Sequence, residues 1–393
     1  MSGALRRIAT SAFVALPYQI ADRIHPWRRR MYRETAVTAV EADERTLLIG
    51  PVNSAGQGYA WARAAELLPG VTAVNLMYRG TADRFGFPAD HSVRADVASG
   101  VRRWQEGERR AIESAFTHVI VESGAHLFDT HVSMADHLRS MADAGISVAL
   151  LFHGSDIRRP RTHARSEPDS PFRDGQYDET ELLETITSRN HALIEQAGLP
   201  VFVSTPDLLL DVPNATWLPV VVQPERWSEA APQAALERPR PVVVHAPSRA
   251  GLKGSALIEQ VVHRLHDDGI IEYREVQGVP ANEMPRVYGD SDVVLDQFSL
   301  GIYGVAACEA MAAGRLVVSH VSDFVRSEVR ARTGADLPIL ESTAADLERV
   351  LRDIAAHRER YAETASAGTE FVRRVHDGRA SAGVLGGFLG RPD

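Results

Sequence analysis

Short apolar runs alternate with segments of helical periodicity along most of the chain. The runs are four to seven residues long, are rich in Val, Ile, Leu and Ala, and are mostly followed by turn-forming or polar residues. Such runs are typical of strands buried on both faces, as in a parallel sheet covered by helices. We expect strands at Thr46–Gly50, Thr72–Met77, Thr117–Glu122, Ile146–Phe152, Pro200–Ser204, Val242–His245, Ile270–Val276, Asp292–Leu295 and Leu316–Ser319.

Helical segments fall between these runs. We expect helices at 59–68, 134–144 and 179–196, one that begins after Ser255 and ends near Gly269, and one at 344–355 with Ser342 as its N-cap. Strands that alternate with helices in this way predict an α/β fold with parallel sheets.

The alternation lapses between Pro219 and Pro241, where further prolines and an Ala/Glu/Arg-rich stretch indicate a linker. The prediction is therefore two Rossmann-like doubly wound domains that face a central cleft. The expected organisation is a basic N-terminal segment at 1–45, a first domain at 46–222, a linker at 223–240, a second domain at 241–375, and a C-terminal helix at 376–393 that packs back on the first domain.

Composition and charge restrict the classes of protein to consider. The chain has 393 residues, 44% of them hydrophobic, and a formal net charge of −9, which argues against non-specific nucleic-acid binding. The single cysteine, Cys308, allows no intrachain disulfide, fits a reducing compartment, and lies in an apolar stretch where we expect an inert core thiol. No run approaches the ~20 apolar residues of a membrane-spanning helix. We therefore predict a cytoplasmic protein.

The N-terminus differs from the rest of the chain in charge. Residues 1–33 carry seven arginines and one acidic residue, Asp22. Two interpretations stay open: a surface helix packed on the first domain, or a basic amphipathic segment that contacts an anionic membrane surface at its inner face. The apolar run that ends at Pro17 lacks the cleavage site of a signal peptide.

Lys253 is the only lysine among 43 basic residues. It follows the predicted strand Val242–His245, within Ala246-Pro-Ser-Arg249-Ala-Gly-Leu-Lys253-Gly254. A loop between a strand and a helix directs backbone N–H groups and a positive helix end above the sheet. A compact ammonium suits phosphate as a point charge. Alternatively, Lys253 has no functional role and is simply the one lysine in an arginine-rich composition.

A second segment follows the strand Asp292–Leu295: Gly304-Val-Ala-Ala-Cys-Glu309-Ala-Met-Ala-Ala-Gly314. Gly304 and Gly314 are expected to begin and end a short helix. Glu309 then lies within an apolar helix and needs hydrogen-bond donors, which ribose hydroxyls could supply. A surface glutamate, or one paired with an arginine, is the alternative.

At these residues the chain resembles the GT-B glycosyltransferases, specifically the retaining, nucleotide-sugar-dependent family-four type. The resemblance rests on Arg249 and Lys253-Gly254 after a strand and on the Gly304–Gly314 segment. His153-Gly-Ser-Asp156 and Ser204-Thr-Pro-Asp207 after two other strands support it, and it extends from about residue 46 over nearly the whole chain.

The resemblance implies roles for individual residues. Arg249 and Lys253 would hold the diphosphate of the donor with backbone N–H groups near Gly304 and Val305, and Glu309 would hold the ribose. The family usually has a second glutamate eight residues before this one, but Gly301 stands there, and Asp296 and Gln297 are the nearby candidates to substitute. Fixed cations and helix dipoles suit a departing diphosphate, and no metal site or further cofactor is predicted.

The first half offers two further candidate loops. Gly50-Pro-Val-Asn53-Ser-Ala-Gly56-Gln-Gly58 is glycine-rich but matches neither a Walker loop nor a GxGxxG fingerprint. In the resembling family this loop lies beside the acceptor and the diphosphate, so Asn53, Gly56 and Gly58 are candidates; a tight turn is the alternative. His153 could bind donor-sugar hydroxyls or move a proton, with Asp156 orienting it.

The hypothesis that these features favour is a metal-independent, retaining glycosyltransferase that takes a nucleotide-diphosphate sugar. The acceptor, whether glycan, lipid-linked or small molecule, stays open. One alternative is a non-hydrolysing nucleotide-sugar epimerase. The other is an inactive pseudo-transferase that binds the nucleotide sugar, which Gly301 would favour.

Overall fold

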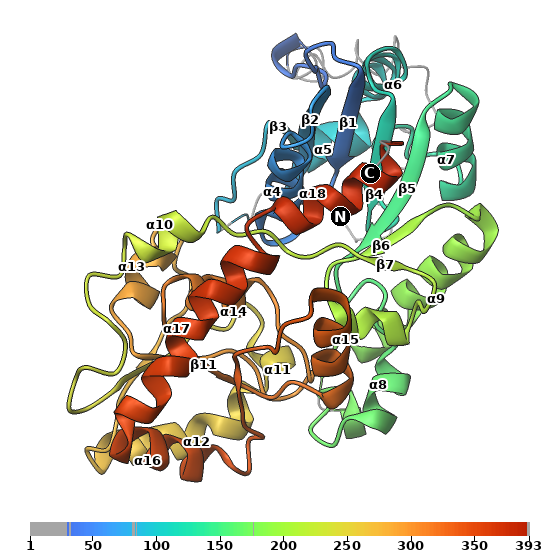
Figure 1. Ribbon diagram of the computed structural model, residues 1–393. Coiled ribbons are helices and arrows are strands. Elements are labelled where there is room, and N and C mark those ends of the chain that lie inside the picture. The colour runs from blue at the N-terminus through green and yellow to red at the C-terminus, as the bar shows by residue number, and fades with distance from the viewer. Residues whose placement is uncertain (1–29, 31–32, 81–82, 84, 176, 391–393) are drawn as a thin grey trace.

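The computed structural model describes residues 30, 33–80, 83, 85–175 and 177–390. The two interpretations of the basic N-terminus concern residues that lie almost entirely outside this part of the chain. Two lobes, each built on its own sheet, face each other (Figure 1).

The N-terminal half contains a seven-stranded parallel sheet in the order β3-β2-β1-β4-β5-β6-β7. Its strands are β1 (Arg45–Gly50), β2 (Val71–Arg79), β3 (His91–Arg94), β4 (His118–Glu122), β5 (Ser147–Phe152), β6 (Val201–Val203) and β7 (Thr216–Trp217). Its helices are α4 (Gln57–Ala65), α5 (Ala95–Gly100), α6 (Arg102–Ala115), α7 (Met134–Asp143), α8 (Pro160–Ser166) and α9 (Thr180–Ala197), with short 3-10 turns η1 (Ser54–Gly56), η2 (Arg173–Gly175) and η3 (Pro206–Leu210).

The C-terminal half contains a five-stranded parallel sheet in the order β12-β11-β10-β8-β9. Its strands are β8 (Val242–His245), β9 (Glu272–Glu275), β10 (Val293–Leu295), β11 (Leu316–Ser319) and β12 (Leu340–Glu341). The helices from this part of the chain are α10 (Pro224–Ser228), α11 (Ala250–Lys253), α12 (Ser255–Asp267), α13 (Met284–Gly289), α14 (Val305–Ala312), α15 (Asp323–Thr333), α16 (Leu347–Ala356), α17 (Arg358–Val375) and α18 (Arg379–Phe388).

The predicted doubly wound architecture is confirmed in both halves. The central strands β1 and β8 each contain three consecutive buried apolar residues, and Leu47, Leu48, Ile49 and Val243 are completely buried. The strand order reverses between β1 and β4 in the first sheet and between β8 and β10 in the second. Loops at the carboxyl ends of these strands therefore diverge and leave room for a ligand.

The chain crosses between the halves twice, and the two crossings are bonded to each other. The Val222 N–H donates to the carbonyl of His376 (2.8 Å), and His376 Nδ1 lies 2.7 Å from the carbonyl of Val220. Burial lowers the pKa of His376 to about 4, so the imidazole is neutral and its Nδ1–H donates to that carbonyl. After the second crossing, α18 packs on α4 of the N-terminal half (Figure 1).

The expected linker at 223–240 is more structured than its composition indicates. It begins with helix α10, which packs on α13 and α14 of the C-terminal half. Ser342 does not cap the helix expected at 344–355: α16 begins at Leu347, and the Ser342 hydroxyl donates to the carbonyl of Thr343 instead. The intervening residues form a turn, since Asp346 N–H donates to the hydroxyl of Thr343.

A second contact joins the halves away from the crossings. The segment around α8 leaves the first sheet and reaches the loop after β10, where His163 Nε2 lies 3.2 Å from the carbonyl of Leu300. Glu167 then meets His320 of the C-terminal half, with 3.0 Å between Oε2 and Nε2. Hydrogen bonds to Glu167 and Glu341, outweighing burial, raise the pKa of His320 to about 9. This imidazolium is an ionic tie between the halves.

Candidate active site

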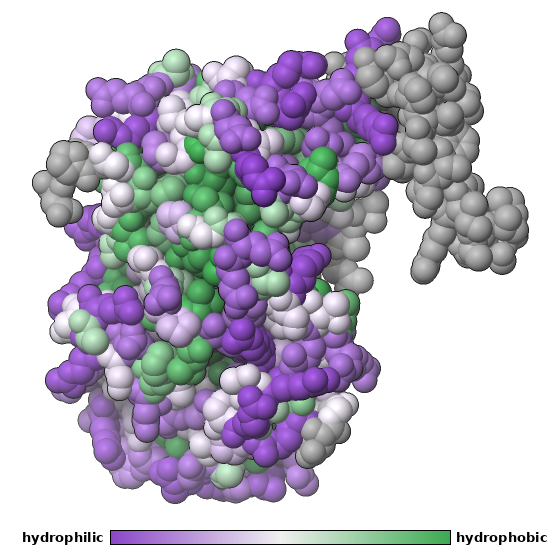
Figure 2. Space-filling model, turned by 90° about the vertical axis from the view of Figure 1, so that its right-hand side faces the viewer, coloured by the Kyte–Doolittle hydropathy of each residue, from purple (hydrophilic) through white to green (hydrophobic). Residues whose placement is uncertain are grey.

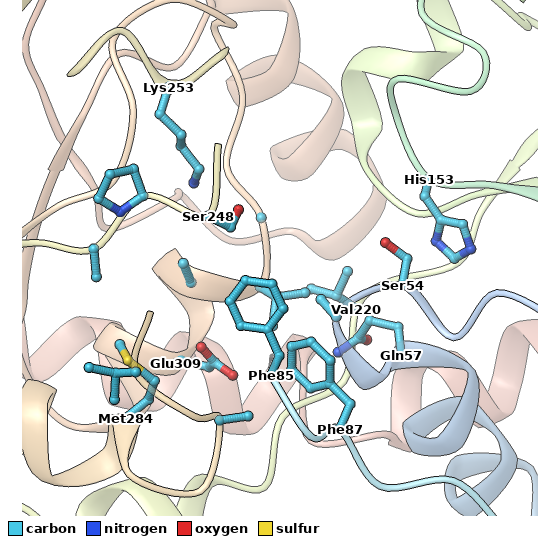
Figure 3. A pocket seen from close by; sticks show the side chains of 18 of the residues that line it. Ser54, Gln57, Phe85, Phe87, His153, Val220, Ser248, Lys253, Met284 and Glu309 are labelled. Carbon is cyan, nitrogen blue, oxygen red and sulfur yellow. The ribbon is translucent and has the colours of Figure 1, made fainter. Parts of the chain in front are cut away.

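The carboxyl ends of strands from both sheets meet around one cavity of about 280 Å³ between the halves (Figure 3). A second cavity of about 740 Å³ adjoins it and shares Gln57, Phe87 and Glu309. Ligand cavities commonly span ~300–1,000 Å³, so the joined space accommodates a ligand of nucleotide-sugar size. The polar residues of the first cavity are Ser54, Gln57, His153, Ser204, Thr205, Ser248, Lys253, Tyr288 and Glu309.

Lys253 ends the short helix α11 and points into this cavity. Its ammonium donates to Oδ1 of the buried Asp296, which follows β10. The other carboxylate oxygen of Asp296 is buried and has no hydrogen-bond partner among the described residues. The chain turns sharply after Lys253 because Gly254 has a φ of 71°, and a Cβ there would lie 2.3 Å from Ser299 Oγ. Lys253 is therefore a cation fixed at the cavity wall.

The N-terminus of α14 faces the same space. Gly304, Val305 and Ala306 line the cavity, and no side chain caps this end of the helix. Its first N–H groups carry the positive end of the helix dipole, so the end is suited to an anion. Gly304 and Gly314 flank α14 as predicted.

Glu309 lies one turn into α14, half-buried at the boundary of the two cavities. No hydrogen bond or ion pair engages its carboxylate within the described part of the chain. Burial raises the pKa of Glu309 to about 8, and the negative charge of Asp296 also raises it. The positive charges of Arg226 and Lys253 lower this pKa but do not outweigh burial. At neutral pH the unliganded side chain is therefore mostly the uncharged carboxylic acid, and ligand hydroxyls that donate to it would favour the carboxylate.

His153 forms the opposite wall at the end of β5. Its Nε2 lies 3.0 Å from Oε1 of the fully buried Glu122, and its ring stacks on Trp61 with 5.7 Å between centroids. Burial opposes the charged imidazolium, but the hydrogen bond to Glu122 and the charges of Glu122 and Asp156 outweigh it and raise the pKa of His153. Because Nε2 is engaged, Nδ1 is the nitrogen left for a ligand.

Glu122 also fixes the glycine-rich loop after β1. Its Oε2 accepts the N–H groups of Val52 and Asn53, each at 2.8 Å. The Asn53 side chain donates to the carbonyl of Pro88 and accepts from the N–H of Tyr59. Asn53 thus supports the loop from inside, and the residues of this loop that line the first cavity are Ser54, Ala55 and Gln57.

The remaining candidates take different positions. Gly56 lines the second cavity, whereas Gly58 packs closely on Asn75, where a Cβ would lie 2.4 Å from Nδ2. Asp156 accepts the N–H groups of His153 and Gly154 and the hydroxyl of Ser123, so it holds the loop after β5. It is not among the residues that line either cavity.

Arg249 and Gln297 do not line the cavity either. Arg249 is exposed at the start of α11, close enough to Tyr177 to influence its pKa. Gln297 is fully buried, and its amide binds the backbone of Leu300, Ile302 and His320. Gln297 therefore shapes the loop after β10.

Gly301 is buried with a φ of 64°. A Cβ there would lie 2.8 Å from Oε1 of Glu167, which comes from the N-terminal half. A glutamate at this position would have a strained backbone, and its Cβ would clash with the Glu167 carboxylate. The conformation of this loop therefore favours glycine over the glutamate that the family usually has here.

The sequence did not indicate Trp61, Phe85, Phe87 and Met284, all of which line the cavity or hold a lining residue. Glu122 also holds a lining residue, and its position at the end of the predicted strand Thr117–Glu122 was the available signal. The aromatic residues at 85 and 87 come from a loop whose path the sequence does not indicate.

The part of the chain that the structure describes contains no cluster of three His, Cys, Asp or Glu side chains arranged to hold a metal ion. None of its helices combines the length and the apolar character needed to cross a membrane. Cys308 is completely buried, and burial raises the pKa of its thiol, as expected for a core cysteine.

No protein-family model and no curated protein sequence matches the chain. Solved structures do match. An alpha-glucosyltransferase in complex with UDP and a 13-mer DNA is similar with a TM-score of 0.58 and 9% identity, over 89% of this chain and 100% of that one. The Anabaena protein HepE, in complex with UDP and glucose, is similar with a TM-score of 0.53 and 10% identity, over 88% and 99%.

Sucrose-phosphate synthase from Thermosynechococcus elongatus is similar with a TM-score of 0.52 and 13% identity, over 88% of this chain and 98% of that one. At these identities the matches establish the fold. The chain has the two-domain GT-B fold of known glycosyltransferases, as predicted.

Proposed function

We propose that the protein is a glycosyltransferase that takes its sugar from a nucleoside-diphosphate sugar. The observation that carries the proposal is one cavity with a fixed ammonium (Lys253), an uncapped helix N-terminus (α14) and a carboxyl group without a partner (Glu309) on one wall, and His153 on the other. The ammonium and the helix N-terminus suit a diphosphate, Glu309 suits a ribose, and His153 suits a sugar hydroxyl. The GT-B fold supports the same assignment.

The proposed reaction transfers the sugar without a nucleophile from the protein. The bond from the anomeric carbon to the diphosphate oxygen breaks, and its electron pair leaves with the diphosphate. The acceptor hydroxyl oxygen bonds to the same face of that carbon, and its proton passes to the departing diphosphate. Lys253 and the α14 dipole stabilise the charge that develops there, and Arg249 adds an outer, solvent-screened cation.

Retention of configuration, metal independence and a cytoplasmic location are parts of this proposal that rest on the family resemblance and the sequence. His153 Nδ1 would hold a donor-sugar hydroxyl, and the acceptor would enter from the N-terminal half, beside the loop after β1. Movement about the two chain crossings would exclude water during transfer.

Binding of nucleoside diphosphates tests the donor assignment. Removing Lys253 alone would leave the buried Asp296 carboxylate unpaired and lower stability. The paired variant Lys253→Met with Asp296→Asn avoids this. We expect it to weaken binding of UDP, GDP or ADP at least tenfold by calorimetry with little change in melting temperature, whereas Asp296→Asn alone keeps the cation and most of the affinity. Unchanged affinity in the paired variant would refute the assignment.

A nucleotide-sugar-binding protein without transfer activity is the second candidate, and the geometry at Gly301 favours it. Product analysis across donors and candidate acceptors separates the two. Nucleotide binding without transfer, hydrolysis or epimerisation would support the binding protein, and an epimerised nucleotide sugar formed without any acceptor would indicate an epimerase.

A further inference from the structure

Phe85 belongs to the N-terminal half but is attached to the C-terminal half. It lies between β2 and β3, and its carbonyl accepts the N–H of Ala281, in the loop that follows β9, at 3.0 Å. Its side chain is 37% exposed and lines the first cavity together with Met284 and Glu309 (Figure 3). The backbone of Phe85 is thus held between the two halves, while part of its ring stays exposed in the cavity.

The ring has a firm support on its other side. Phe87 stacks on it with 5.7 Å between centroids and an interplanar angle of 30°. Phe87 in turn packs against Gly56, where a Cβ would lie only 3.1 Å from Cδ1. The Arg79 guanidinium donates to the carbonyl of Phe87, and Asn53 donates to that of Pro88. The two rings form an aromatic shelf whose place is set by both the loop after β1 and the contact with Ala281.

The wall of the C-terminal half near this shelf is mainly apolar. Val276, Val279 and Met284 line the cavity beside Ala281, and Glu309 and Lys253 lie on the same side of the cleft. An exposed phenylalanine and an apolar wall in one cavity gain stability when a flat apolar group covers them. Among the parts of a nucleoside-diphosphate sugar, the nucleobase has that shape and chemistry.

We propose that Phe85 stacks on the nucleobase of the donor, opposite the apolar side chains of the C-terminal half. This inference rests on the proposed function and adds that the N-terminal half contributes to nucleotide binding through an aromatic face. Stacking accepts any base, so Phe85 supplies affinity for the nucleoside part rather than a choice among bases. A nucleotide bound in this way touches both halves and stabilises their closed arrangement.

Calorimetric titration of the full chain tests the proposal with UDP, GDP, ADP and inorganic pyrophosphate. We expect Phe85→Ala to weaken binding of the nucleoside diphosphates about 5- to 100-fold, Phe85→Leu to weaken it less, and Phe85→Trp to restore it. Pyrophosphate binding is expected to change less than twofold, because it has no base. Leu210→Ala, at an exposed leucine that does not line either cavity, serves as the control.

The outcomes separate the two proposals. If the unaltered protein binds none of the nucleoside diphosphates, the proposed function fails. If it binds them and Phe85→Ala binds them within twofold as well, the proposed function stands and the stacking role is refuted. Equal weakening of nucleoside diphosphates and pyrophosphate in Phe85→Ala, with a melting temperature like that of the control, would also refute it, because the loss would then not involve the base.

Discussion

The two walls of the cleft differ in whether their acidic side chains are hydrogen-bonded. On the N-terminal wall, Glu122 accepts three hydrogen bonds and Asp156 holds the loop of His153, so each carboxylate already has its partners. On the C-terminal wall, Glu309 has no partner among the described residues and one oxygen of Asp296 is unpaired. The paired carboxylates fix the orientation of their neighbours, whereas the unpaired acidic groups gain their missing partners from a ligand.

Removing Glu122 tests the first half of this comparison and is expected to have the largest effect. Glu122→Ala leaves the buried N–H groups of Val52 and Asn53 without an acceptor. We expect a loss of about 3–5 kcal/mol in the free energy of unfolding, measured with denaturant. Glu181→Ala, at an exposed ion pair, serves as the control and is expected to cost less than about 1 kcal/mol. A loss below 1 kcal/mol in Glu122→Ala would contradict a supporting role.

The ionic tie between the halves is expected to give a pH dependence of intermediate size. The pKa of His320 rises from an ordinary 6.5 to about 9 in the folded protein. Above pH 6.5 the folded state therefore binds more protons than the unfolded state, and stability falls as pH rises through 9. We expect a loss of about 2–3 kcal/mol between pH 6.5 and 10 that is much smaller in His320→Gln. Identical slopes in the two proteins would remove His320 as the cause.

Glu309 tests the acidic side chains without partners on the C-terminal wall, where the smallest of these effects is expected. Ribose hydroxyls that donate to its carboxylate would make UDP bind about tenfold more tightly than 2′-deoxy-UDP. Glu309→Gln is expected to reduce this ratio to about twofold without lowering the melting temperature, since a half-buried carboxylate without partners adds no stability. Calorimetry with both nucleotides measures the ratio. An unchanged ratio would show that the ribose lies elsewhere.

The fold could be predicted largely from the apolar runs. Val242–His245 and Leu316–Ser319 match their strands residue for residue, because each begins with three consecutive apolar residues and has clear breaks beside it, the prolines at 241 and 247 or the polar Arg315 and His320. Strand His91–Arg94 was missed because it lies at the edge of its sheet, where only Val93 needs to be buried. On the face of the molecule in Figure 2, hydrophilic residues surround a band of hydrophobic ones.

Candidate site residues could be predicted from the sequence where their place in the fold depends only on which strand they follow. Lys253, Glu309 and His153 follow strands whose ends meet at one cleft in a doubly wound fold, so their convergence follows from the topology. Phe85 could not be found in this way, because its place depends on how far one half reaches toward the other. The role of Gln297 could not be predicted for another reason, since its amide binds the backbone of its own half rather than the cavity.

The paired chain crossings restrict how the lobes can part. A single strand of chain would let them rotate in any direction, but two segments joined by His376 and Val222 share one bending axis. Rotation about that axis changes the geometry near His376 very little and separates the distant loops most. Opening about that axis would have to break the Phe85–Ala281 and Glu167–His320 contacts, so admission of a substrate and release of a product would depend on the same movement.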